Sequence, residues 1–399
     1  MTTTPTQETR IPRVFLKAGR ETPLEGFHPW VFSGAVQKID PCQPGDLVRV
    51  YGADKRFYGV GFVNRDSQIL VRMIAFEDTA VDAGFFGRRI SEALALRAHL
   101  LKPGTDAYRL VNAEGDFLPG LTIDRYADTL VLQVHSAGMD RHKQEIVSAL
   151  QQLLEPRAIY ERSDAETRQR EGLAPAEGIL AGDAPADRVM ITENGHRFGV
   201  DVRRGQKTGF FLDQRENRER VGQMAAGRRV LNTFCYTGGF SVYAAKGGAK
   251  QVISVDVSRE ALEQGCDNYS ENGLEVREGE WVKADVFDYL RQSAGEYDLI
   301  VLDPPAFCKR REDVPDACRG YKDINLQALR KCAPGAIVHT YSCSSHMTTD
   351  LFRKVVFGAA KDSGRQVRVI AETAHPADHP VSLYHPEGSY LKGLVLHVS

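Results

Sequence analysis

The sequence predicts three domains: an all-β barrel at the N-terminus, a small central α/β domain, and a larger C-terminal α/β domain built on a doubly wound parallel sheet. Three observations predict this fold class. Short β-type runs broken by turns fill residues 1–78, a mixed helix and strand pattern fills residues 79–188, and strand-like and helix-like segments alternate over residues 189–399. The chain is also 42% hydrophobic, which is enough for more than one core.

The barrel is predicted from the even spacing of its apolar runs. VFSGAV, LVRVYG, FYGVGFV and ILVRMI follow one another between residues 31 and 74, and Gln43-Pro44-Gly45-Asp46 supplies a turn. Trp30 precedes the first clear strand, where an aromatic side chain most simply packs in the core. This pattern is typical of a small all-β domain.

The central domain is predicted to combine two helices with a strand pair. Residues 84–101 carry apolar side chains at helical spacing, and residues 140–154 do the same. Between them, LPGLTIDRY and TLVLQVH read as strands, and the Ala127-Asp128 pair that separates them suits a hairpin. Residues 163–187 are rich in Ala, Pro, Gly and charge, so we expect a loop that leads into the last domain.

The overall composition excludes several classes of protein. A net charge of −2 gives no global nucleic-acid signature, so an RNA-binding face would have to be a local basic patch. The seven cysteines are odd in number and include no C-x-x-C pair, which argues against a disulfide framework and a zinc ribbon, and we expect no metal site. Residues 1–10 have no apolar core for a signal peptide, and no stretch approaches the roughly 18 apolar residues of a membrane span. We therefore expect a cytoplasmic protein with no membrane contact.

The C-terminal domain is predicted from a series of apolar runs that alternate with helical segments. The strands we expect are RRVLNTF, QVISVD, WVKAD, YDLIVLD and GAIVHTY, followed by QVRVIA and LKGLVLHV. The last two are expected to form an antiparallel addition at the sheet edge. In open α/β sheets of this kind, ligands bind at the carboxyl ends of the strands.

The first three strands of this domain each end in residues that suit a nucleoside cofactor. LNTFCYTGGFS turns on Gly238-Gly239 and begins a helix, so the backbone can approach a ligand there. Asp256 ends the next strand, where an acid can accept hydrogen bonds from both ribose hydroxyls, and Asp285 and Val286 end the third, where they suit an adenine ring. A single Asp at a strand end is about as often a helix cap as a ligand-binding residue. Three consecutive strands that all end in this way favour a cofactor site. The turn is not G-x-G-x-x-G, which argues against a nicotinamide cofactor.

A polar and aromatic segment, RRGQKTGFFLDQRENRERV, precedes this series. Asp213 and Glu216 have the spacing of a helix capping box, and we expect that structural role for both. Lys207, Phe210 and Arg215 are left unexplained by capping. A loop of this composition could cover one end of a cofactor or admit a base.

A thiol and a carboxylate end two further strands. Cys343 follows GAIVHTY, and Asp303 begins the Asp303-Pro304-Pro305 sequence after YDLIVL. A cytosine ring becomes nucleophilic at C5 only after a thiolate adds at C6, and a nearby acid is needed to take up the charge that develops at N3. A buried structural cysteine is the alternative for Cys343, but its position beside the D-P-P strand favours catalysis.

Together these segments resemble the class I S-adenosylmethionine-dependent methyltransferases. The chain is similar to the bacterial large-subunit (23S) ribosomal RNA cytosine-C5 methyltransferases that carry an N-terminal PUA domain. The resemblance rests on LKAGRETPLEGFHPWVFSGAV, RLVNAEGDFLPGLTIDRY, GQKTGFFLDQREN, LNTFCYTGGFSVYAAKGGA, VLDPPAF, YSCSS and HPEGSYLKGL, which span nearly the whole chain. It implies a PUA-like RNA-binding barrel (1–78), a central α/β domain (79–188) and a Rossmann-like catalytic domain (189–399).

The resemblance also implies roles for individual residues. Cys343 would be the nucleophile and Asp303 the acid that stabilises charge, with large-subunit ribosomal RNA as the substrate. The residues expected to bind S-adenosylmethionine are Lys207, Phe210, Gln214, Arg215, Asn232, Phe234, Tyr236, Gly238, Gly239, Asp256, Val257, Asp285, Val286 and Asp303.

One departure leaves alternatives open. Many RNA cytosine methyltransferases place a second cysteine directly after the prolines for product release, but here Ala306 holds that position and the nearest thiol is Cys308. A sibling branch that methylates guanine N7 needs no nucleophilic cysteine, so Cys343 argues against that reading. A catalytically silent ribosome assembly factor is the third reading, which the series of strand-end acids disfavours. The sequence leaves open a homodimer and does not identify the modified nucleotide or the group that removes the C5 proton.

Overall fold

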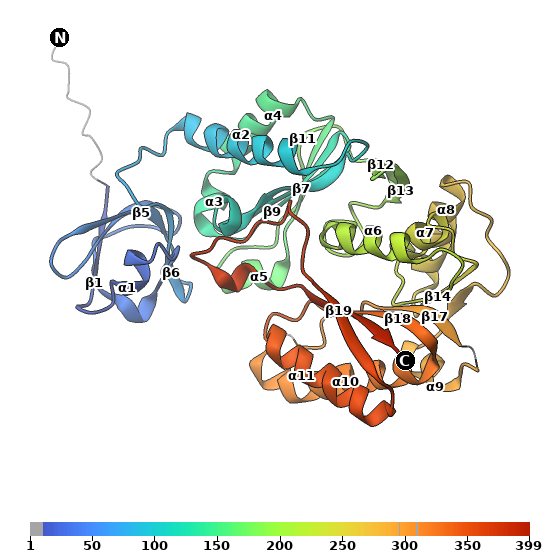
Figure 1. Cartoon of the computed structure of the whole chain (residues 1–399). Helices are drawn as coiled ribbons and strands as arrows, with labels where there is room; N and C mark the ends of the chain where they lie inside the picture. The colour runs from blue at the N-terminus through green and yellow to red at the C-terminus, as the bar shows by residue number, and fades with distance from the viewer. Residues whose placement is uncertain (1–10, 295, 309) are drawn as a thin grey trace, which may run out of the picture.

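The computed structural model describes residues 11–294, 296–308 and 310–399. Residues 1–10, for which we predicted the absence of a signal peptide, lie outside the described residues. They also include the start of the predicted barrel domain. Figure 1 shows the N-terminal β domain in blue, the central domain in cyan and green, and the C-terminal domain in green through yellow to red. No helix within the described ranges is long and apolar enough to span a bilayer.

The N-terminal domain is a six-stranded sheet with the order β2-β6-β5-β4-β1-β3. Alternate residues of β1 and β4 are buried, as a sheet with one face on the core requires. The buried side chains include Val14, Leu16, Val48 and Val50, and this confirms the predicted all-β domain. Its elements are β1 (Arg13–Leu16), α1 (Thr22–Glu25), β2 (Trp30–Phe32), η1 (Ser33–Ala35), β3 (Val36–Ile39), β4 (Leu47–Tyr51), β5 (Phe57–Val63) and β6 (Ile69–Ala75).

The central domain is a five-stranded sheet with the order β11-β10-β9-β8-β7, and α2 and α4 pack together beside it. The predicted hairpin joins β8 to β9, and Ala127 adopts the left-handed conformation that the tight turn requires, with φ of 54°. Its elements are α2 (Ala83–Leu100), β7 (Ala107–Asn112), η2 (Ala113–Asp116), β8 (Leu121–Tyr126), β9 (Thr129–Val134), α3 (Ala137–Arg141), α4 (Lys143–Leu154), β10 (Ala158–Arg162), α5 (Ala165–Arg170) and β11 (Glu177–Gly182).

One prediction for this domain was wrong. The segment 163–187 is not a continuous loop, because Asp164 accepts a hydrogen bond from Thr167 N and caps α5, and β11 pairs antiparallel with β10. The sequence of β11, EGILAG, places Ile179, Leu180 and Ala181 side by side between two glycines, so it lacks the alternation of apolar and polar residues that marks a strand. The helix expected over residues 140–154 is confirmed as α4, which begins at Lys143 because His142 separates it from α3.

The C-terminal domain carries a seven-stranded sheet with the order β16-β15-β14-β17-β18-β20-β19. Strands β14 to β18 are parallel to one another, whereas β20 lies antiparallel between β18 and β19, which confirms the predicted addition at the edge. The strands of the sheet are β14 (Arg229–Thr233), β15 (Gln251–Asp256), β16 (Trp281–Lys283), β17 (Tyr297–Leu302), β18 (Cys332–Ser342), β19 (Val367–Thr373) and β20 (Lys392–Val398). The strand order reverses between β14 and β17, the point at which doubly wound sheets bind ligands.

Helices pack around this sheet, and a separate hairpin precedes it. The hairpin of β12 (Val189–Glu193) and β13 (His196–Val200) shares one hydrophobic core with residues of the central domain. The predicted boundary at 188 and 189 therefore falls just before a shared core, and the three domain limits stay predictions. The remaining elements are η3 (Leu212–Gln214), α6 (Arg215–Met224), α7 (Gly239–Lys246), α8 (Arg259–Glu271), α9 (Val286–Gln292), η4 (Arg311–Asp313), α10 (Val314–Lys331), α11 (Thr349–Ser363) and η5 (Pro386–Gly388).

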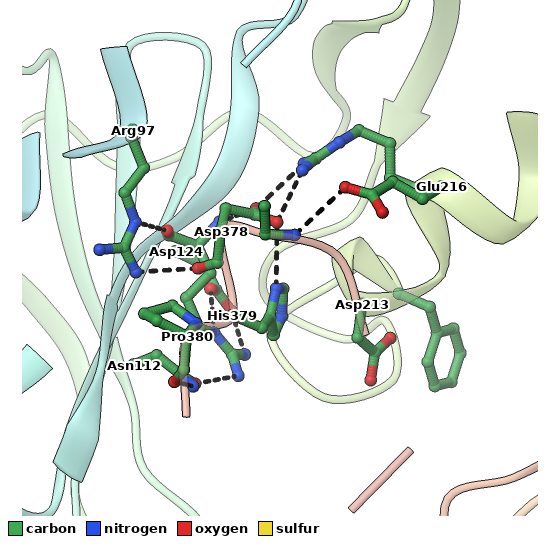
Figure 2. Close-up of polar contacts among 12 residues, drawn as sticks. Arg97, Asn112, Asp124, Asp213, Glu216, Asp378, His379 and Pro380 are labelled. Carbon is green, nitrogen blue, oxygen red and sulfur yellow. Dashed lines mark hydrogen bonds and ion pairs between the residues drawn. The ribbon is translucent and has the colours of Figure 1, made fainter. Parts of the chain in front are cut away.

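The segment between β19 and β20, residues 374–391, fastens the C-terminal domain to the central one (Figure 1). Figure 2 shows Asp378 at the centre of this contact, between Arg97 and α6. The Asp378 carboxylate accepts hydrogen bonds from Arg215 Nη2 at 2.6 Å and from Arg109 N at 3.0 Å, and its carbonyl accepts one from Arg97 Nη2. All of these polar groups are therefore satisfied in a buried site.

The same segment approaches the central domain very closely and then reaches the N-terminal domain. Pro380 O accepts a hydrogen bond from Asn112 Nδ2, and a Cβ at Gly115 would lie only 1.9 Å from that carbonyl oxygen. Further along, the His385 ring lies 4.3 Å from the Trp30 ring, measured between centroids. Trp30 therefore packs against the C-terminal segment and donates a hydrogen bond to a central-domain carboxylate, that of Glu114.

Candidate active site

The predicted nucleophile and acid lie at the carboxyl ends of neighbouring parallel strands. Asp303 follows β17, Cys343 follows β18, and Leu302 pairs with Thr340 in the register of these strands. The Cys343 Sγ lies 4.0 Å from Pro304 O, and both predicted catalytic residues line one pocket. The structure therefore brings together the thiol and the carboxyl group that the sequence placed on separate strands.

Burial shifts the titration of both groups toward their protonated forms. It raises the pKa of Asp303 to about 7, with a further contribution from the negative charge of Asp213. Burial likewise raises the pKa of the Cys343 thiol to about 11, although the Lys207 charge acts in the opposite direction. Near neutral pH, Asp303 can therefore donate a proton, and Cys343 needs a group that removes its own.

The glycine turn and Asp256 form the other wall of the same pocket. Gly238 has φ of 76°, and a Cβ at Gly239 would lie 2.9 Å from Arg218 Cδ, so both positions are restricted to small side chains. Asp256 accepts backbone hydrogen bonds from Tyr236 N and Ser258 N, which fixes the carboxylate at the pocket wall.

These residues fit a nucleoside cofactor. Each Asp256 oxygen keeps a second lone pair for a ribose hydroxyl. Val257 lies next to Asp256 on the pocket wall and is 60% exposed, so it offers an apolar surface to a ring. The pair supplies the polar and the apolar contact that a nucleoside needs.

The loop before α6 closes the pocket over the acid. Gln214 Nε2 donates a hydrogen bond to Asp303 Oδ1 at 2.8 Å, and Phe210 lines the wall. The expected capping box is wrong, because no side chain caps η3 or α6. Instead Asp213 Oδ2 accepts hydrogen bonds from Lys207 Nζ and from Tyr390 OH, both at 2.7 Å.

Ten of the residues predicted for catalysis or cofactor binding line this pocket, and five do not. Those in the lining are Lys207, Phe210, Gln214, Phe234, Tyr236, Gly239, Asp256, Val257, Asp303 and Cys343. Arg215 is not among them, because its guanidinium is buried in the ion pair with Asp378; it holds the connecting segment instead of a cofactor.

The other four residues outside the lining have partners of their own. Asn232 Nδ2 donates to Ser241 Oγ, and its Oδ1 is buried without a partner among the described residues. Gly238, which directly precedes α7, lies against the ring of Trp281. Asp285 caps α9 by accepting a hydrogen bond from Asp288 N, and Val286 is buried in the core. Their roles in cofactor binding stay predictions.

Sequence reasoning missed three residues of the site. Arg218 lines the pocket and pairs with the buried Glu193, and Tyr390 holds Asp213. Lys392 is buried beneath the Cys343 loop, with hydrogen bonds to two carbonyls. Tyr390 and Lys392 belong to the HPEGSYLKGL segment. That segment contributed to the family resemblance, but no role was predicted for its residues.

Comparison with known protein families gives two matches. Residues 119–339 match the S-adenosylmethionine-dependent methyltransferase family, and residues 14–76 match a PUA-like domain. These matches confirm the predicted PUA-like β domain, the Rossmann-like methyltransferase domain and the cofactor. Within the described residues, no group of three or more His, Cys, Asp or Glu side chains is arranged to hold a metal ion.

Several relatives match nearly the whole chain. The Ribosomal RNA large subunit methyltransferase I of Shewanella denitrificans is 47% identical over 393 residues, which cover 97% of this chain and 99% of the relative. That of Klebsiella pneumoniae is 44% identical, with 97% and 98% covered. Among solved structures, the methyltransferase SMU.776 complexed with S-adenosylhomocysteine has a TM-score of 0.84 at 25% identity, with 97% of this chain and 100% of that chain covered.

Proposed function

Because the chain belongs to the S-adenosylmethionine-dependent methyltransferases of large-subunit ribosomal RNA, we propose that it methylates C5 of a cytosine in the 23S ribosomal RNA. The observation that carries this proposal is the convergence of Cys343 and Asp303 on one pocket. A thiol is needed where an aromatic carbon must first be made nucleophilic, and that requirement is specific to pyrimidine C5. S-adenosylmethionine, when bound, supplies the methyl group as an electrophile.

Residues of the pocket carry out the other steps of the proposed reaction. The Cys343 thiolate adds to C6 of the cytosine and forms a carbon–sulfur bond, which makes C5 nucleophilic. Asp303, whose raised pKa of about 7 keeps a large fraction protonated near neutral pH, gives a hydrogen bond or a proton to N3 and so takes up the charge that develops on the ring. After methyl transfer a base removes the C5 proton, and the electron pair of that C–H bond forms the C5–C6 double bond again as the carbon–sulfur bond breaks. The thiolate is regenerated, and any proton given to N3 returns to Asp303.

The Gln214 contact keeps the acid in place for this role. Gln214 is 2% exposed, and its own Oε1 accepts a hydrogen bond from Asn217 Nδ2 at 2.6 Å. A side chain held at both ends has few rotamers to lose, so Asp303 is oriented before the base arrives. Gln214 acts here as a positioning residue.

The alternative substrates predict a different site. Methylation at guanine N7 uses a ring nitrogen that is already nucleophilic, so it needs no thiol beside the acid. A silent assembly factor has no need for an acid with a pKa of about 7 next to the thiol. We favour cytosine C5 on both grounds. The N-terminal β domain is proposed to contact the RNA, with action in the cytoplasm; a homodimer stays a prediction.

The test is mass-spectrometric mapping of 23S ribosomal RNA from a strain that lacks the gene. The proposal expects loss of one 5-methylcytidine, restored by the wild-type gene and not by the Cys343→Ala variant. Loss of a methylated guanine with 5-methylcytidine intact would reject the cytosine assignment, and unchanged RNA would reject the catalytic role.

A further inference from the structure

An aromatic cavity lies where the three domains meet. Its volume is about 360 Å³, which is within the size range of ligand pockets. Phe27 lines it from the N-terminal domain, Phe117 from the central domain, and Tyr384 from the segment between β19 and β20, drawn in red in Figure 1. These three residues are 48%, 48% and 47% exposed. The cavity is therefore complete only in the assembled chain, and its aromatic rings are open to a ligand.

Two of the three rings stand on an uncommon backbone conformation. Phe27 has φ of 59° and Phe117 has φ of 57°, in the left-handed region that bulky residues rarely adopt. Phe27 lies just after α1, and Phe117 ends η2, at positions where glycine or asparagine is the usual residue. Backbone outliers of this kind cluster at ligand-binding sites. Their occurrence on both sides of one cavity indicates that the exposed rings serve more than packing.

Neighbouring side chains hold the rings in place. The Phe27 ring lies 5.3 Å from the Phe76 ring, edge to face, and 5.2 Å from the Tyr384 ring, measured between centroids. The Arg89 guanidinium lies 5.6 Å from the centroid of the Phe117 ring. A ring that is fixed but still half exposed offers a flat apolar face with little freedom to lose on binding.

The charged residues of the cavity favour a base over a phosphate. Glu77 and Glu114 both line it, and their carboxylates would repel a phosphate but can accept hydrogen bonds from the amino group of a base. Arg89 is the cation in this lining. One of its five N–H groups donates to Glu92, so others can bind the phosphate that adjoins a bound base.

One segment connects this cavity to the catalytic pocket. Tyr384 and Tyr390 belong to the same stretch of chain, and six residues span at most about 22 Å even when fully extended. Tyr390 OH donates to Asp213, which lines the catalytic pocket. An RNA strand with its target nucleotide in that pocket therefore has neighbouring nucleotides within reach of the cavity.

We propose that this cavity binds an unpaired base of the substrate RNA, a short distance along the strand from the methylated nucleotide. The base stacks on the exposed aromatic rings, as unpaired bases do in other RNA-binding sites. The carboxylates accept hydrogen bonds from its amino group, and Arg89 faces the adjoining phosphate. This inference rests on ribosomal RNA being the substrate in the proposed function, but not on which base is methylated.

The test measures RNA binding, so it does not require methyl transfer. The full-length protein is titrated into deproteinised 23S ribosomal RNA from a strain that lacks the gene, with unrelated RNA as competitor, and the dissociation constant is measured by filter binding. Phe117→Ala and Tyr384→Ala, which lie in different domains, should each raise it about tenfold through the loss of a stacking ring. In methyl-transfer assays they should raise KM and leave kcat within about twofold of the wild-type value.

Matched variants separate stacking from folding. Phe357→Ala removes a phenylalanine that is 69% exposed on α11 and does not line the cavity, so it should bind RNA like the wild type. Tyr384→Phe keeps the ring and should bind within about twofold of the wild type. All four variants should bind S-adenosylmethionine normally and unfold at the wild-type temperature. If Phe117→Ala does not fold, Tyr384→Ala decides the result alone.

The outcomes distinguish this inference from the proposed function. Wild-type RNA affinity in both alanine variants would overturn the cavity assignment. An effect seen only with large-subunit precursor particles, and not with free RNA, would also overturn it, because the cavity would then bind a ribosomal protein. RNA binding that depends on both rings, in a wild-type protein that transfers no methyl group to this RNA, would reject the proposed function and support the cavity assignment.

Discussion

Gln214 Nε2 and Asp303 Oδ1 lie 2.8 Å apart, so the start of α6 is bonded directly to the acid of the D-P-P sequence. This contact joins two segments 89 residues apart in the chain. The donated hydrogen bond favours the ionised carboxylate, but burial and the Asp213 charge outweigh it. Among the described residues only Oδ1 has a side-chain hydrogen-bond partner, so Oδ2 can carry the proton toward a substrate base.

The raised pKa of Asp303 predicts a pH-dependent cost in stability. Its folded-state pKa of about 7 lies above the ordinary value of 3.8, so between these values the folded protein binds more protons than the unfolded chain, and stability falls as pH rises. Asp303→Asn should therefore raise the free energy of unfolding on the order of 1 to 3 kcal/mol near pH 8, with much less effect near pH 4.

Urea unfolding of the variant at both pH values checks this, with loss of methyl transfer as the second readout. Asp288→Asn, at an exposed position, serves as the control and should change stability by less than about 0.5 kcal/mol at either pH. A variant of Asp303 that is destabilised at pH 8 would show that the carboxyl group is ionised and well solvated in the free protein.

Asp256 is predicted to hold the ribose of the cofactor. Asp256→Ala should weaken S-adenosylmethionine binding by about 1.5 to 3 kcal/mol for each charged hydrogen bond lost, which is roughly tenfold or more in affinity. Calorimetry measures this directly. Asp267→Ala, on the exposed side of α8, is the control and should bind normally. Unchanged affinity of the Asp256 variant would leave this acid as a turn-forming residue alone.

Cys308 is predicted not to release the product. Its Sγ donates to Arg310 O at 2.9 Å, and burial raises the pKa of the thiol, so it is neither free nor a ready base. Cys308→Ser should turn over nearly normally and accumulate no covalent RNA adduct on a denaturing gel. A persistent adduct that disappears when Cys343 is also replaced would assign release to Cys308.

Asp378 is predicted to be the strongest structural contact between the C-terminal and central domains. Asp378→Ala leaves Arg215 buried without its partner, so the free energy of unfolding should fall by about 3 to 5 kcal/mol. Glu372→Ala breaks an exposed pair with Arg353 and should cost at most about 1 kcal/mol. Urea unfolding of the two variants compares them, and equal losses would contradict the role of the buried pair.

The catalytic sheet could be predicted because each strand is an apolar run that ends in a distinctive side chain. That pattern is local, and Asp256, Asp303 and Cys343 follow from it directly. The edge strand β11 could not be found in the same way, because its sequence, EGILAG, is a short apolar run between glycines with no alternation of polar and apolar residues.

Asp213 and Arg215 show the limit of local patterns more clearly. The spacing of Asp213 and Glu216 fits a capping box, but Asp213 bonds instead with Tyr390, which is 177 residues away. Arg215 lies in the loop expected to bind cofactor, yet its partner Asp378 is 163 residues away. Hydrogen bonds to residues far away in the chain compete with local helix capping. The spacing of residues in the sequence does not predict such distant partners.

The central claim is that Cys343 forms a covalent bond to cytosine C6, and trapping on fluorinated RNA tests it most directly. Large-subunit ribosomal RNA containing 5-fluorocytidine should hold the wild-type protein as an adduct, because fluorine cannot leave C5 as a proton does. Peptide mapping should place the bond on Cys343, and Cys343→Ala should bind S-adenosylmethionine without forming an adduct. An adduct mapped to another residue, or normal methyl transfer by Cys343→Ala, would contradict the account.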